Sequence, residues 1–132
     1  MASILVVDDE PDVAEAIGAV LQHAGFTVVV ADSASRGLQA VADRKFDVVV
    51  TDIIMPRVNG LELIRKLRAA HPRVRVIAIS GGGSFGPLSL KPDAISTHAF
   101  IAAAREAGAE DVLTKPFDME DLLSAVRKHL PN

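Results

Sequence analysis

Residues 47–52 read DVVVTD, a run of three valines that ends at an acidic side chain. Valine favours extended backbone, and a run without polar alternation is typical of a strand that is buried on both faces. Two further runs share this character, SILVV (3–7) before Asp8 and VRVIAI (74–79) before Ser80. Such strands belong to parallel sheets that helices cover on both sides. The sequence therefore predicts an α/β protein.

Helical patterns separate these strands. Apolar residues at helical spacing predict helices from Pro11 to a stop at Gly25 and over 33–43, 60–70, 97–107 and 118–130. Two more strands are expected over 26–31 and 111–114. This alternation predicts a doubly wound, five-stranded parallel sheet with right-handed crossovers. The stretch 81–96 holds four glycines and two prolines, so we expect an extended loop there.

Composition limits the classes of protein to consider. The chain has 132 residues, 49% hydrophobic and 23% charged, which fits one domain over 1–132. A net charge of -3 argues against a nucleic-acid partner, and the absence of cysteine excludes disulfides and thiolate zinc sites. No apolar run approaches the roughly 20 residues of a membrane helix, and the start lacks the basic region of a signal peptide. We therefore expect a cytoplasmic protein without a membrane partner.

Polar side chains follow four of the predicted strands. Asp8 and Asp9 end the first strand, and Asp52, Ser80 and Lys115 end three others. Functional groups of a doubly wound sheet collect at the carboxyl ends of its strands. We therefore expect these five side chains to meet at one edge.

Three carboxylates at one edge indicate a particular chemistry. Like charges that close resist joint ionisation, so they either share a proton or hold a dication. Hard oxygen ligands with open positions suit Mg²⁺, which also takes a phosphate oxygen. A metal and a lysine beside one carboxylate favour phosphoryl transfer, and aspartate is a known phosphoryl acceptor.

Four stretches carry a resemblance to a known family: LVVDDEP (5–11), DVVVTDIIMPRVNG (47–60), VIAIS (76–80) and DVLTKPF (111–117). In this order they resemble the receiver domain of two-component response regulators, over the whole chain apart from the loop after Ser80. The resemblance implies a flavodoxin-like fold and a phosphoryl group taken from a histidine kinase or histidine phosphotransfer protein. It also implies output through a protein partner, whose identity stays open. We expect a receiver that stands alone as a single domain; a receiver excised from a longer protein is the alternative.

The resemblance assigns the metal and acceptor roles. Asp52 matches the phosphoacceptor of the family. Asp8 and Asp9 match the acidic pair that holds Mg²⁺, Asp9 directly and Asp8 largely through water. The backbone carbonyl of Ile54 matches a further metal ligand, and Gly60 belongs to the turn after the acceptor.

Two switch positions follow from the same match, and one departs from it. Ser80 resembles the switch hydroxyl, and Lys115 resembles the phosphate-contacting lysine that precedes a cis proline, here Pro116. Many receivers carry an aromatic ring or a histidine three residues before the lysine, where this chain has Val112. The stretch from Ser80 to Lys115 is also longer than usual. Both departures concern output rather than phosphoacceptance.

Alternative functions stay open at this point. One is a pseudo-receiver that binds a protein without being phosphorylated; the intact acid, serine and lysine set argues against it, and Val112 argues for it. An aspartyl-phosphate phosphatase would need an acid where Ile54 stands. We therefore expect no enzyme for outside substrates, but a receiver that catalyses only its own phosphorylation and dephosphorylation.

Simpler interpretations also apply to single features. Ser80 could satisfy backbone groups at a strand end, and Lys115 could be a surface lysine before a turn. The stretch 81–96 reads either as a flexible linker or as a lid over the phosphorylation site.

Overall fold

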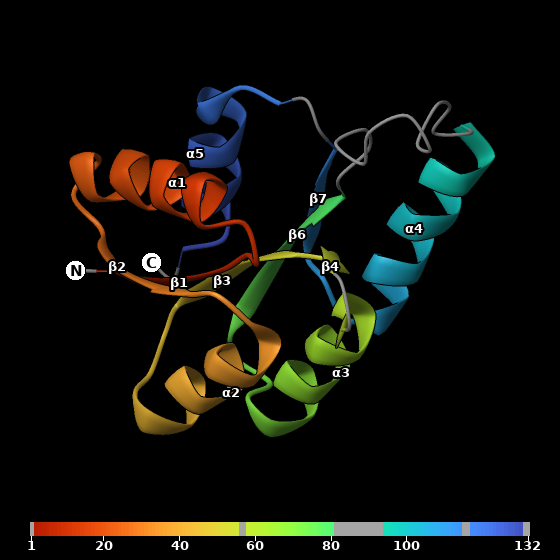
Figure 1. Ribbon diagram of the computed structural model, residues 1–132, viewed down its shortest axis with the longest axis horizontal. Coiled ribbons are helices and arrows are strands. Elements are labelled where there is room, and N and C mark those ends of the chain that lie inside the picture. Colours follow the sequence, from red (N-terminus) through yellow and green to blue (C-terminus); the bar gives the residue numbers. More distant parts are fainter. Residues whose placement is uncertain (1, 56–57, 81–93, 115–116, 131–132) are drawn as a thin grey trace.

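The protein is an α/β sandwich built around one parallel sheet (Figure 1). The computed structural model describes residues 2–55, 58–80, 94–114 and 117–130. The sheet strands are β1 (Ser3–Val7), β2 (Thr27–Ala31), β3 (Val48–Asp52), β6 (Arg75–Ser80) and β7 (Asp111–Thr114). The helices are α1 (Pro11–His23), α2 (Ala34–Asp43), α3 (Gly60–Ala70), α4 (Ala94–Ala107) and α5 (Met119–Lys128). The spatial order β2-β1-β3-β6-β7 is that of flavodoxin-like folds, which confirms the predicted fold class.

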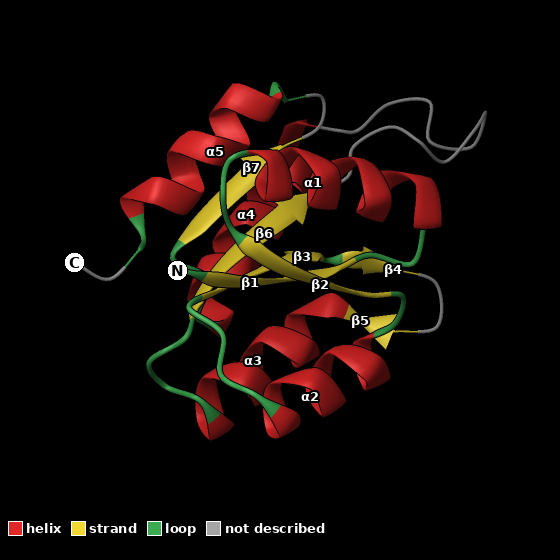
Figure 2. Cartoon of the chain, turned by 90° about the vertical axis from the view of Figure 1, so that its left-hand side faces the viewer, coloured by secondary structure: helices red, strands yellow, loops and turns green. Residues whose placement is uncertain are grey.

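Helices cover both faces of the sheet. Figure 2 shows α1 and α5 on one face and α2 and α3 on the other. The core is accordingly divided in two: Ile4 and Val6 of β1 pack toward α1 and α5, whereas Leu5 and Val7 belong to the cluster that includes α2, α3 and α4. Successive strand residues point to opposite faces, so a valine-rich strand fills both halves of the core at once.

β3 is the most deeply buried strand of the sheet. It pairs with β1 on one side and β6 on the other, and all five of its residues are buried. Full burial of each valine contributes about 1.5–3 kcal/mol of transfer free energy, so the strand is held firmly. By contrast, β2 lies at the edge of the sheet, and its Val30 is 43% exposed. Asp52 is therefore the last residue of the most deeply buried strand of the sheet.

The helix ends mostly agree with the predicted signals. Pro11 occupies the first turn of α1, and Gly25 adopts φ 102° just beyond its end. Ser33 caps α2 by accepting a hydrogen bond from the Arg36 N–H. The α5 helix is shorter than predicted, because Asp118 is its N-cap and it ends at Lys128.

The predicted loop boundary at residue 96 was wrong. α4 begins at Ala94, so the last three residues of the expected loop, Ala94–Ser96, are helical. Glycines and prolines earlier in the stretch led to a longer loop, but these three residues include neither, and alanine has the highest helix propensity. The rest of the stretch, 81–93, lies outside the described residues. Within the described ranges, no helix has the length and apolar character needed to cross a membrane.

Candidate functional site

Asp52 lies at the middle of the sheet edge, as the last residue of β3. It is 3% exposed and pairs in register with Ile79 of β6. The backbone continues this pairing for one more step, because the Ile53 N–H donates to the Ile79 carbonyl at 3.0 Å. The buried Thr51 hydroxyl donates to the Asp52 carbonyl at 3.1 Å. These contacts fix the backbone on both sides of the carboxylate.

Asp8 follows β1, the strand beside β3. Val7 pairs with Thr51, so Asp8 comes one step later, next to Asp52 along the edge. Asp8 is 1% exposed, its N–H donates to the Ala31 carbonyl, and its Oδ1 accepts a 2.9 Å bond from the Glu10 N–H. This bond shapes the turn that leads into α1, and it holds one oxygen of Asp8 in place. Asp9, between the two bonded residues, stays partly exposed.

The three carboxylates meet as predicted. One oxygen from each of Asp8, Asp9 and Asp52 lies within 4.8 Å of the other two. In an octahedral Mg²⁺ site with bonds of about 2.1 Å, adjacent oxygens are about 3.0 Å apart and opposite ones about 4.2 Å. The three oxygens are therefore near enough to share one dication once the side chains move closer together. The donor set consists only of hard carboxylate oxygens, and Asp9 keeps one side open to water, which fits Mg²⁺.

A short hairpin follows Asp52 and was not predicted. Ile54–Met55 forms β4 and pairs antiparallel with β5, Val58–Asn59. Ile54, the predicted carbonyl ligand, therefore lies two residues beyond Asp52, at the start of this hairpin. Two-residue strands have no periodicity, so nothing in the pattern of residues could have indicated them.

Gly60 follows this hairpin and begins α3 in close contact with the backbone of Ile53. A Cβ atom at Gly60 would lie 2.4 Å from Ile53 Cα and 2.6 Å from the Ile53 carbonyl oxygen. Only glycine therefore lets α3 begin this close to the residue after Asp52. The sequence motif predicts a glycine at this distance from Asp52, and the close approach of the Ile53 backbone explains why no larger residue fits.

Ser80 and Lys115 are described to different extents. Ser80 ends β6, the neighbour of β3, and its backbone pairs with Thr114 of β7. Its backbone therefore stands on the same edge as Asp52, while its side chain lies outside the described part of the chain. Lys115 and Pro116 also lie outside it, so the predicted roles of both residues stay predictions.

Val112 fills the position where many receivers carry a ring. It pairs with Ala78 of β6, is partly buried and packs against the cluster that contains Ala104 and Ala107 of α4. The aliphatic side chain of Val112 thus packs from β7 toward α4. It contributes packing there but has no hydroxyl or ring nitrogen with which to form a hydrogen bond.

Comparison with known families decides the identity of the fold. The response regulator receiver domain family matches residues 4–88, a stretch that contains all three acids, Gly60 and Ser80. The chain belongs to this family. Response regulators are the receiving components of two-component signalling systems, so this receiver domain is part of a signalling protein family.

Relatives of this receiver domain include longer regulators and single domains. The uncharacterized transcriptional regulatory protein YkoG of Bacillus subtilis is 31% identical over 127 residues, which are 96% of this chain and 50% of YkoG. The response regulator MprA of Mycobacterium sp. is 34% identical over 94% of this chain and 48% of its own. A receiver domain protein from Clostridium thermocellum has a TM-score of 0.81 at 30% identity, covering 98% of this chain and 94% of that one. The receiver domain thus spans about half the length of the curated relatives YkoG and MprA.

Proposed function

We propose that this receiver domain accepts a phosphoryl group on Asp52 from a histidine kinase or a histidine phosphotransfer protein, and that Mg²⁺ assists the transfer. The observation that carries the proposal is the convergence of Asp8, Asp9 and Asp52 around a buried acceptor at the sheet edge. Membership of the receiver family supports the same chemistry. The signal then passes to a protein partner, and the proposal includes a cytoplasmic location.

The reaction needs a positioned carboxylate more than a strong nucleophile. An oxygen of Asp52 attacks phosphorus, the P–O bond forms, and the P–N bond to the donor imidazole breaks. The electron pair of that bond stays on the imidazole nitrogen, which leaves as part of a neutral ring once it holds a proton. Asp52 belongs to a buried strand that pairs on both sides, and this strand would hold the carboxylate in position for the attack. Positioning of the reacting groups is a main contribution of a protein to phosphoryl transfer.

The remaining residues neutralise charge. Asp8, Asp9, Asp52 and the Ile54 carbonyl would hold the Mg²⁺, whose positive charge would offset the negative charge of the carboxylates and of the phosphoryl group. In this proposal Lys115 pairs with a phosphoryl oxygen, and the Ser80 hydroxyl donates to another. The domain acts on no outside substrate, because Ile54 stands where a phosphatase of the aspartyl-phosphate type would need a second acid.

Phosphorylation by a small donor tests the proposal directly. We expect the intact protein to gain the mass of one phosphoryl group when it is incubated with acetyl phosphate and Mg²⁺. Asp52→Asn removes the nucleophile and should abolish the gain, because the amide nitrogen cannot accept the group. Asp12→Asn is a matched control, since Asp12 is an exposed acid in the first turn of α1, outside the cluster.

Two outcomes would contradict the proposal. No mass gain in the wild-type protein would favour the pseudo-receiver, which binds a partner without phosphate. A gain that survives Asp52→Asn would place the acceptor elsewhere. Peptide mapping of the phosphorylated protein, after borohydride reduction of the acyl phosphate, identifies the modified residue in either case.

A further inference from the structure

A cavity opens at the edge of the sheet opposite to Asp52. Its volume is about 1010 Å³, and its walls come from three segments that are distant in the sequence. They are the connection from α2 to β3, the connection from α3 to β6, and the end of α5, together with Glu110 before β7. The carboxylate cluster contributes nothing to this cavity, so a ligand there would occupy a second site.

The walls of the cavity are basic, although the chain as a whole is acidic. They carry five cationic side chains, Arg44, Lys45, Arg73, Arg75 and Lys128, against two acids, Asp47 and Glu110. The walls thus have a net charge of +3, while the whole chain has 14 Lys and Arg against 17 Asp and Glu. Nine cations against fifteen acids, a net charge of -6, remain for the rest of the chain.

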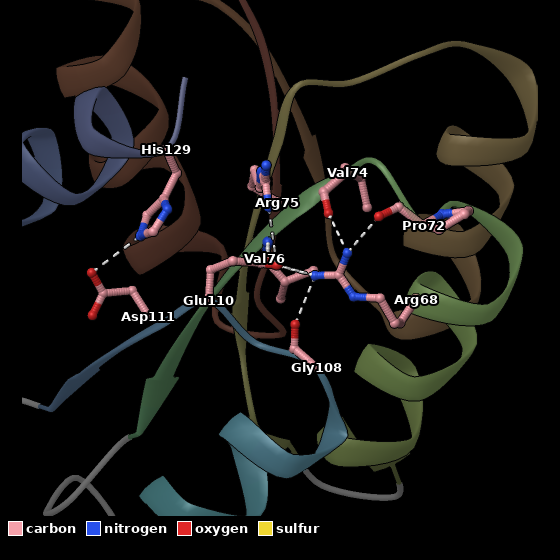
Figure 3. A network of polar contacts seen from close by, with 9 residues as sticks. All are labelled: Arg68, Pro72, Val74, Arg75, Val76, Gly108, Glu110, Asp111 and His129. Carbon is pink, nitrogen blue, oxygen red and sulfur yellow. Dashed lines mark hydrogen bonds and ion pairs between the residues drawn. The ribbon is translucent and has the colours of Figure 1, made fainter. Parts of the chain in front are cut away.

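Both acids of the cavity already bind groups of the protein. The Asp47 Oδ2 accepts a 2.8 Å bond from the Ser3 N–H. The Glu110 carboxylate pairs with Arg68, accepts a 2.8 Å bond from the Val76 N–H and lies 3.8 Å from Arg75 (Figure 3). Across the described ranges, Lys45, Arg73 and Lys128 have no ion-pair partner of their own. Most of the positive charge is therefore available to a ligand.

The negative partial charges of nearby helix ends offset only part of the positive charge of the walls. α2, α3 and α5 all end beside the cavity, and the carboxyl end of a helix attracts cations. Each such end is equivalent to roughly -0.5 of a charge, so three ends offset about half of the net +3. About half of the positive charge of the walls therefore remains without a balancing negative charge from the helix ends.

The cavity also offers apolar surface and one preset cation. The Arg44 guanidinium lies 5.2 Å from the centroid of the Phe46 ring, a cation–π contact that restricts the arginine. Val41 and Val74 are buried in the wall, and Leu130 is partly buried there. A planar guanidinium matches two phosphate oxygens at once, and long lysine arms can adjust to others. The volume is that of pockets for ligands much larger than a bare phosphate ion.

We propose that this cavity binds a small organic phosphate, in which the phosphate groups contact the cations and a flat, weakly polar body contacts the apolar wall. A nucleotide has this chemistry and this size. Because Asp52 does not line the cavity, the ligand would bind whether or not Asp52 is phosphorylated. It would bind at the edge of the sheet opposite to the phosphorylation site.

Nuclear magnetic resonance titration of the whole chain tests the proposal, with ATP and inorganic pyrophosphate as probes. The buffer contains EDTA and no Mg²⁺, so that the acidic cluster takes no part. We expect saturable shifts confined to amides of residues 41–47, 73–75 and 128–130, with tighter binding of ATP than of pyrophosphate. The double variant Arg73→Glu with Lys128→Glu should weaken ATP binding by about tenfold or more, because two charge-assisted contacts are lost.

The control has the same change of charge outside the cavity. Arg65 and Arg127 are exposed, neither lines the cavity, and Arg127 is the immediate neighbour of Lys128 in the last turn of α5. The variant Arg65→Glu with Arg127→Glu should keep ATP affinity within about twofold, since neither side chain lines the cavity and charges that lie in solvent are partly screened by salt. Both double variants should still gain phosphate from acetyl phosphate and Mg²⁺, which separates this inference from the function proposed for Asp52.

Three results would overturn the inference. The first is the absence of saturable shifts at the cavity. The second is equal weakening by the two double variants, which would indicate general attraction of anions. The third is equal affinity for ATP and pyrophosphate, which would show that the apolar wall has no part in binding.

Discussion

The two edges of the sheet use charge in opposite ways. At the carboxyl edge, short acidic side chains converge on backbone that is hydrogen-bonded on both sides, and Asp8 and Asp52 are buried. At the amino edge, long basic side chains surround an open cavity and are mostly exposed. Short buried groups fix the distances that bond-making chemistry requires, whereas long exposed groups adapt to a ligand. Under the two proposals above, covalent chemistry and reversible binding take place on opposite edges of the sheet.

Gly60→Ala should have the largest effect, because it breaks the carboxyl edge at its tightest contact. The new Cβ would lie 2.4 Å from Ile53 Cα, which is backbone and cannot rotate away. We expect the free energy of unfolding to fall by about 3 kcal/mol, the upper range for overpacking. Urea denaturation measures this loss, and the variant's remaining folded protein should also be phosphorylated more slowly, since Ile53 adjoins Asp52.

Gly25→Ala is the matched control for this prediction. Gly25 has φ 102°, but a Cβ there has no atom within 4 Å, so only backbone strain of about 1–2 kcal/mol is expected. Phosphorylation of Gly25→Ala should keep the wild-type rate. Equal losses of stability in the two variants would mean that close packing at Gly60 is unimportant.

Arg68→Ala should have the next largest effect, at the amino edge. The Arg68 guanidinium donates to the carbonyls of Pro72, Val74 and Gly108 and pairs with Glu110, and so ties the end of α3 to the segment between α4 and β7. Removal leaves the Glu110 carboxylate, 19% exposed, without its main cation. We expect a loss of about 2 kcal/mol after allowance for partial exposure, measured by urea denaturation.

The exposed pair Lys66–Glu62 provides the contrast. Its atoms are 3.9 Å apart and both side chains are 60% exposed, so Lys66→Ala should cost less than about 0.5 kcal/mol. In high salt the small effect of Lys66→Ala should vanish while most of the Arg68→Ala effect stays. If salt removed both effects, the Arg68 contacts would be no more than surface electrostatics.

The sequence predicted the carboxyl edge far better than the amino edge. The bounds of β1, α3 and β7 were predicted to the residue, because polar residues, a glycine or a proline interrupt the apolar pattern at or near their ends. Parallel strands bring their carboxyl ends to one edge, so the meeting of Asp8, Asp9 and Asp52 followed from topology alone. The points at which the apolar strands end therefore carried most of the information about the acidic site.

No comparable rule predicts the basic cavity. Its cations lie at or near helix ends and strand starts in three distant segments, and each one alone reads as an ordinary surface residue. The start of α4 was wrong for a different reason, because the glycines and prolines before Ala94 extended the expected loop over three residues that contain no helix breaker. A site that is assembled from several distant segments leaves no recognisable pattern within any one of them, so it cannot be predicted from the order of residues.

Asp9→Ala should have the smallest effect, and it sharpens the comparison by testing whether the acids repel one another. Without metal, removal of one of three neighbouring carboxylates should raise the free energy of unfolding by about 0.5–1 kcal/mol, because like charges at this distance destabilise the folded state. With Mg²⁺ at tenfold its dissociation constant, wild-type protein should gain about 1.4 kcal/mol, and Asp9→Ala should lose most of this gain. Thermal and urea unfolding in EDTA and in Mg²⁺ give all four values. Asp12→Ala, which removes an exposed acid outside the cluster, should change neither the metal-free stability nor the gain from Mg²⁺ by more than about 0.5 kcal/mol. A fall in the metal-free stability of Asp9→Ala would mean that the acids are held apart well enough to coexist without a cation, and the fixed geometry of the carboxyl edge would then have to be explained without metal binding.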